Sequence, residues 1–160
     1  MLTNSISLFE NEHIEDLGEG VGVVVSKQHT FGTDAMLLAS FANPRPTDNA
    51  CDFGTGCGII PFLWLRDKKC SEISAIEIQE NACNQVERSI VLNNTEKIKI
   101  YNRDLKNIDD FKDDFPEEVE EFLKWYNNQY KEDNWHLDKD ILSNGVRIYS
   151  PQTCCFLPPE

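Results

Sequence analysis

The segment from residue 51 to residue 60 constrains the fold most, because it places one acid and three alternating glycines between two apolar runs. It reads Asp-x-Gly-x-Gly-x-Gly, with the acid at Asp52 and the glycines at Gly54, Gly56 and Gly58. The dinucleotide fingerprint G-x-G-x-x-G needs its third glycine one residue later, and a P-loop needs a closing Gly-Lys-Ser/Thr that is absent here. We therefore expect a loop whose backbone approaches a small, nucleotide-like cofactor of a different kind.

Around this loop the sequence alternates between short β-branched runs and helical patterns, which predicts parallel strands joined by right-handed helical crossovers. We expect strands at 21–25, 49–53, 73–76 and 98–101, and helices over 59–65 and 81–92. Thr33-Asp34 is expected to cap a further helix, which should end at residues 43–46. At 160 residues the chain is short for a complete seven-stranded sheet. We therefore expect an α/β fold with a truncated parallel sheet, followed by an irregular helix-plus-loop C-terminal segment.

Three acids follow three of the expected strands, and their register is what makes the glycine loop informative. Asp52, Glu77 and Asp104 each lie at or just beyond the carboxyl end of a strand. Ligands of open α/β sheets bind outside those ends. This arrangement is typical of methyltransferases that use S-adenosylmethionine (SAM), a ligand with a sulfonium and an ammonium cation.

Each acid has a specific role in that interpretation. Asp52 would hold the loop and attract the amino end of the ligand. Glu77, 19 residues past Gly58, would accept hydrogen bonds from both ribose hydroxyls. Asp104 would accept one from the adenine amino group. The competing interpretation, a tight turn with solvated acids, explains each feature singly, but not their shared register.

The composition bears on three further classes of protein: nucleic-acid-binding, metal-binding and membrane or secreted proteins. The net charge of −13, with acids in excess on both sides of residue 104, argues against a general nucleic-acid trap without excluding a local basic patch. Neither the three histidines nor the six cysteines show metal-ligand spacing, and no Cys-x-x-Cys pair is present. We expect reduced, buried thiols and no metal. No run is long enough to span a bilayer and residues 1–10 lack a signal-peptide pattern, so we expect a cytoplasmic protein.

Residues 10–104 resemble a specific group of bacterial methyltransferases, which modify the exocyclic amine of an adenine in the valine tRNA anticodon loop. The matching segments are ENEHIEDL at 10–17, FGTDAMLLA at 31–39, DFGTGCGIIP at 52–61 and IEIQ at 76–79. The resemblance implies a Rossmann-like methyltransferase fold, SAM as cofactor and tRNA as partner. It also implies that Thr33 and Asp34 face the cofactor pocket.

The chain departs from that group after Asp104. The group carries an Asn-Pro-Pro-Tyr motif that accepts hydrogen bonds from the target amine and stacks on the flipped base. Here the one Pro-Pro pair lies in Leu157-Pro158-Pro159-Glu160, where neither flanking side chain suits those tasks. No catalytic residue is assigned, and activity in methyl transfer stays open.

The tail resembles a different group. WHLDKDIL at 135–142 and IYSPQTCCFLP at 148–158 resemble phage proteins related to HNH endonucleases, without the His-Asn-His metal site of that group. We therefore expect a composite chain. Its first part is an incomplete SAM-binding, methyltransferase-like domain over 1–108, and its second part is an acidic helix with a phage-type tail over 109–160. The alternative function is a non-enzymatic DNA-binding or accessory module carried by the tail.

Overall fold

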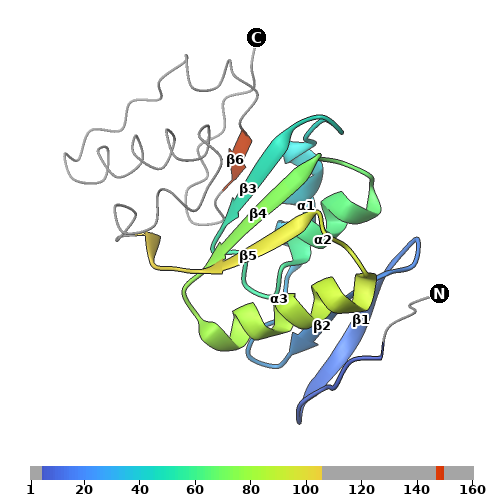
Figure 1. The fold of residues 1–160 in the computed structure, drawn as a ribbon, viewed down its shortest axis with the longest axis vertical. Helices are drawn as coiled ribbons and strands as arrows, with labels where there is room; N and C mark the ends of the chain where they lie inside the picture. Colours follow the sequence, from blue (N-terminus) through green and yellow to red (C-terminus); the bar gives the residue numbers. More distant parts are fainter. Residues whose placement is uncertain (1–4, 106–146, 150–160) are drawn as a thin grey trace.

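The computed structural model describes residues 5–105 and 147–149. Four of its strands form one parallel sheet in the order β5-β4-β3-β6, and β1 and β2 form a separate antiparallel pair (Figure 1). The elements are β1 (Glu12–Gly18), β2 (Val21–Ser26), α1 (Thr33–Ala42), β3 (Asn49–Phe53), α2 (Ile59–Arg66), β4 (Glu72–Glu77), α3 (Glu80–Asn93), β5 (Ile98–Asn102) and β6 (Arg147–Tyr149). The α/β fold with a parallel sheet, predicted from the alternating pattern, is confirmed.

The strand order places a topological switch point beside β3. The chain steps from β3 to β4 to β5 in one direction, and right-handed crossovers then put α2 and α3 on the same face of the sheet. β6 pairs with β3 on the other side, through Ala50–Arg147 to Asp52–Tyr149. In sheets of this kind ligands bind outside the carboxyl ends of the strands, where the order reverses. The residues that follow β3 occupy that position.

Most expected elements are found within two residues of their expected bounds, and three differences have physical causes. β1 was not predicted, because its acids and single apolar positions give only a weak strand pattern. The expected cap at Thr33-Asp34 is wrong: both residues are already helical, and Gly32 holds the N-cap position with no side-chain bond. β6 lies in the C-terminal segment, which was expected to be an irregular helix-plus-loop region. The acidic helix and the rest of the tail lie outside the described residues.

The core lies between the helices and the sheet. Six of the eight residues of α2 are buried, and β3 and β4 are buried at every position but the first, as expected for strands covered by helices. The indole N–H of Trp64 donates to the carbonyl of Ala39 at 3.1 Å, which joins α2 to α1 without leaving a buried polar group unpaired. The large side chains that are fully buried include Phe62, Trp64, Ile73, Ile76 and Val86.

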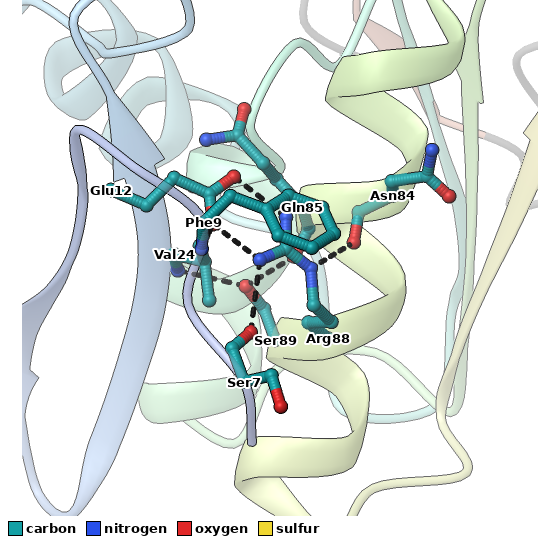
Figure 2. A network of polar contacts seen from close by, with 8 residues as sticks. All are labelled: Ser7, Phe9, Glu12, Val24, Asn84, Gln85, Arg88 and Ser89. Atoms are coloured by element: carbon teal, nitrogen blue, oxygen red, sulfur yellow. Dashed lines mark hydrogen bonds and ion pairs between the residues drawn. The ribbon is translucent and has the colours of Figure 1, made fainter.

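The open edge of β2 is closed by side chains of α3. The backbone N–H of Val24 donates to Ser89 Oγ at 2.8 Å, and Asn93 both accepts from and donates to the backbone of Gly22. These bonds satisfy strand groups that would otherwise need another strand or water. Figure 2 shows Ser89 reaching Val24 from α3. The β1–β2 pair is therefore fixed to α3, the helix that follows β4.

Arg88 ties the segment before β1 to the same helix. Its guanidinium forms two hydrogen bonds with the Glu12 carboxylate, donates to the Ser7 carbonyl at 3.1 Å, and lies 4.2 Å from the centre of the Phe9 ring (Figure 2). The bonds from Arg88 hold the pKa of Glu12 below its usual value. A forked, partly buried pair of this kind contributes more than a solvated surface pair.

Gln85 provides a test of this packing. It is 1% exposed, and neither end of its side-chain amide has a hydrogen-bond partner. An unpaired buried amide costs about 1–3 kcal/mol. We expect Gln85→Met, which keeps the shape, to raise the free energy of unfolding by about 1–2 kcal/mol in urea titration. The same change at exposed Gln28 is the control and should have no such effect; a destabilised Gln85→Met would contradict the unpaired assignment.

Candidate functional site

The turn from β3 into α2 is held to the neighbouring strand by its backbone. The N–H groups of Gly54 and Thr55 both donate to the carbonyl of Ile76, at 2.8 and 3.1 Å, and Gly58 N–H donates back to Thr55 at 2.9 Å. Gly54, Gly56 and Gly58 all have positive φ, between 57° and 83°. This conformation explains why the loop needs glycine at alternate positions.

The three glycines differ in what surrounds them. A Cβ on Gly58 would lie 3.0 Å from Val86 Cγ2 and 3.1 Å from Phe62 Cε2, so this glycine allows α2 and α3 to pack closely. A Cβ on Gly54 or Gly56 would meet nothing within 4 Å. The first part of the loop therefore presents its backbone to open space, where a ligand can approach.

Asp52 lies behind the loop and holds it from within. Its side chain is fully buried, and Oδ2 accepts a hydrogen bond from Thr55 Oγ1 at 2.7 Å, while Oδ1 has no partner. Burial raises the pKa of Asp52 to about 7; the negative charge of Glu77 adds to this rise, and the bond from Thr55 opposes it. Asp52 therefore fixes the loop and does not present an open carboxylate at the surface.

Glu77 joins the loop after β3 to the loop after β4. Its Oε2 accepts from Gly56 N–H and its Oε1 from Gln79 N–H, both at 2.9 Å, and the residue is 5% exposed. A carboxylate has about four lone-pair positions. Two acceptor positions therefore remain after these bonds. The next residue, Ile78, is 60% exposed and adds an apolar surface beside the carboxylate.

The other predicted site residues lie around this centre. Asp104 is half-buried, two residues beyond the end of β5, which is the strand adjacent to β4. Thr33 and Asp34 are exposed in the first turn of α1. Hydrogen bonds thus bring together Asp52, the glycine loop and Glu77. Roles of all the predicted residues in binding a cofactor remain predictions.

Two residues of the site were missed from the sequence. Thr55 holds the Asp52 carboxylate, and its spacing of three residues after an acid in a turn was the available signal. Asn102 donates to the carbonyls of Glu77 and Ile78 at 3.0 Å each. Its signal was positional, since it ends β5 directly opposite Glu77 in the parallel register.

A separate hollow of about 720 Å³ lies at the opposite edge of the sheet. It is lined by residues that precede β2, β4 and β5, among them Glu19, Arg66, Lys68, Asn94 and Lys97. Because ligands of open α/β sheets bind at the carboxyl edge, this hollow is not the candidate site.

Other kinds of site receive no support within the described ranges. Across 5–105 and 147–149, no three His, Cys, Asp or Glu side chains gather as metal ligands. Cys51, Cys57, Cys70 and Cys83 are free and buried, as expected for reduced core thiols, and burial raises the pKa of Cys57 to about 11. None of the helices described is both long and apolar enough to cross a bilayer.

The strand order, the glycine loop and the acid that ends β4 together define an α/β domain of the Rossmann-like, SAM-methyltransferase class. The chain belongs to the methyltransferase small domain family, whose model matches residues 19–115. The family assignment confirms the methyltransferase resemblance of residues 10–104. The resemblance of the tail to phage proteins, and the domain boundary near 108, stay predictions.

Individual relatives match shorter stretches. A tRNA1(Val) (adenine(37)-N6)-methyltransferase of Glaesserella parasuis is 35% identical over 57 residues, covering 36% of this chain and 24% of that protein. Its namesake in Histophilus somni strain 2336 is 34% identical over 76 residues, covering 46% and 32%. This chain therefore spans about a quarter to a third of the length of these relatives. Among solved structures, M. jannaschii TYW2 in complex with AdoMet has a TM-score of 0.49 at 18% identity, covering 65% of this chain and 48% of that one.

The buried Asp52 predicts a pH dependence of stability. A carboxyl whose pKa rises from 3.8 to about 7 on folding stabilises the fold below pH 4, and this contribution is lost as the pH rises towards 7. We expect the free energy of unfolding to fall over that window by up to roughly 1.4 kcal/mol per pH unit from this group. Asp52→Asn should remove this fall in denaturant titrations at successive pH values. An unchanged slope would contradict the buried, proton-binding state.

Proposed function

We propose that the carboxyl edge of β3, β4 and β5 binds SAM, and that the chain is a SAM-dependent methyltransferase. The observation that carries the proposal is the Glu77 carboxylate, which bonds Gly56 of the glycine loop and still has acceptor positions available. In this proposal those positions take the ribose hydroxyls of the adenosyl group. The cofactor would supply a methyl group activated on a sulfonium.

The surroundings of Glu77 support an adenosyl ligand. Gly54 and Gly56 leave open space over the loop backbone, which suits close approach of a sugar or an amino-acid chain. The exposed side chain of Ile78 offers an apolar surface for a purine ring next to the ribose acceptor. Asp104, beyond β5, is proposed to accept from the adenine amino group, and Thr33 and Asp34 to face the same pocket.

Charge favours a cationic ligand over an anionic one. Glu77 raises the pKa of Asp52, which indicates that the two carboxyl groups repel each other when both are ionised. A sulfonium or ammonium at this edge would relieve that repulsion, whereas a phosphate would add to it. The same argument disfavours a dinucleotide, in agreement with the spacing of the glycines.

The acceptor is proposed as the exocyclic amine of a tRNA adenine, after the names of the partial relatives. The Asn-Pro-Pro-Tyr motif that would position this amine is not found in the sequence. Methyl transfer depends on in-line placement of acceptor and donor, and a misplacement of about 1 Å can slow a reaction about a hundredfold. We therefore propose cofactor binding as the role of these residues to test first, and we expect methyl transfer to be slow.

The cofactor site is tested by two matched substitutions on one strand. Glu77→Ala removes the carboxylate at the carboxyl end of β4, and Glu72→Ala removes the one at its other end, which pairs with Lys99. Isothermal titration with SAM should give one site in the parent chain. Loss of charge-assisted hydrogen bonds should weaken it by about tenfold or more in Glu77→Ala.

Glu72→Ala is the control and should bind SAM as the parent does. Because Glu77 also satisfies two backbone N–H groups, Glu77→Gln is measured beside it, and thermal melting confirms that each variant is folded. Absence of any binding heat from the parent at millimolar SAM would end the proposal. Equal weakening by both alanine variants would show that the effect is not local to the site.

The acceptor is tested with radiolabelled SAM and two transcripts of valine tRNA, one with adenine at position 37 and one with guanine there. We expect slow incorporation into the adenine transcript, recovered as N6-methyladenosine after digestion, and none into the guanine transcript. Equal labelling of both transcripts would contradict the proposed acceptor. So would the absence of label from a chain that binds SAM.

A further inference from the structure

We infer that Asn102 is a positioning residue for the SAM site: it fixes the backbone that carries Glu77 and thereby sets the carboxylate against the glycine loop. The inference deepens the proposed function and rests on it. Asn102 is the last residue of β5 and stands opposite Glu77 in the parallel register. Its own side chain need not touch the ligand for this role.

Through its amide nitrogen, Asn102 contacts the backbone at the end of β4 and the thiol of Cys83. Its Nδ2 donates to the carbonyls of Glu77 and Ile78, each at 3.0 Å, and lies 3.3 Å from Cys83 Sγ. Two carbonyl acceptors in reach of one group require a donor with two hydrogens, which identifies the amide nitrogen. The side chain therefore bridges two successive peptide groups at the point where β4 ends.

Glu77 is consequently fixed from both sides. On the backbone side its carbonyl accepts from Asn102, from Arg103 N–H at 3.0 Å and from Cys83 Sγ at 3.4 Å. On the side-chain side its two oxygens accept from Gly56 and Gln79. A ligand acceptor gains affinity when its position is set before binding, because less freedom is lost on association. Of the two side chains that donate to the Glu77 carbonyl, Asn102 makes the shorter contact, at 3.0 Å against 3.4 Å for Cys83.

A merely structural role for Asn102 can be distinguished from a role through Glu77. Asn102 is exposed, so its replacement leaves no cavity in the core. Asn102→Ala removes the two donors. Asn102→Asp keeps the shape but places acceptor oxygens against two carbonyls, which should displace the backbone. Asn102→Asp also adds a negative charge, which alone would favour a cationic ligand. Weaker binding by this variant would therefore separate geometry from charge.

The experiment is isothermal titration of the full chain and its variants with SAM. We expect Asn102→Ala to raise the Kd about tenfold, corresponding to loss of one or two net hydrogen bonds, and Asn102→Asp to raise it further. Asn102→Gln, which keeps the amide on a longer stem, should recover part of the affinity. The matched controls are Asn49→Ala and Asn49→Asp, at the opposite edge of the sheet on β3, which is separated from β5 by β4, and they should bind as the parent does.

A double-mutant cycle supplies the decisive readout. If Asn102 acts through Glu77, Asn102→Ala should change the Kd much less in a Glu77→Gln background than in the parent. Equal effects in both backgrounds, parent-like binding by both Asn102 variants, or failure of Asn102→Ala to fold would each overturn the inference and leave the proposed function standing. A parent chain that does not bind SAM would remove the proposed function, and the inference with it.

Discussion

The candidate site depends on one interaction, the acceptance of two backbone N–H groups by the Glu77 carboxylate. One N–H comes from Gly56, in the loop after β3, and the other from Gln79, at the start of α3. The two loops that border the carboxyl edge are thereby held in a fixed relation. The parallel pairing of β3 with β4 places Glu77 there, one residue beyond the Phe53–Ile76 pair. Sheet register, loop conformation and site geometry are thus parts of the same constraint.

Burial of Asp52 beside the Glu77 carboxylate determines its protonation state. Two carboxyl groups lie close to each other under a glycine loop, and the inner one is fully buried. Burial raises the pKa of Asp52 to about 7 and the negative charge of Glu77 adds to the rise, so the buried carboxyl favours its protonated form. A cationic ligand at the loop would have a similar effect from the outside. The stability of the free chain and its affinity for a cation therefore both depend on Asp52 and Glu77.

Much of the fold could be predicted from the sequence, because the informative elements are long and locally consistent. The apolar runs of β3 and β4, and the helical spacing in α3, required no knowledge of tertiary contacts. The glycines at 54, 56 and 58 indicated a loop with left-handed backbone, and the structure has it. These features depend on local backbone preferences and on burial, which the pattern of residues expresses directly.

The remainder could not be predicted, since it depends on contacts between distant segments. β1 is stabilised by pairing with β2 and by the bonds between Glu12 and Arg88, 76 residues apart. The role of Asn102 follows from a register across two strands, and that of Asp52 from burial that no local pattern measures. The sequence indicated that Asp52 and Glu77 lie at the glycine loop, but not that Asp52 would lie behind it.

The most direct test of the account is a titration of the ¹⁵N-labelled chain with SAM, followed by amide NMR shifts. The account requires the largest changes at Gly56 and Gln79, whose amides donate to Glu77, and at Gly54 of the same glycine loop. Changes grouped at the opposite edge, around Gly20 and Asn94 to Lys97, would place the ligand in the other hollow and contradict the account.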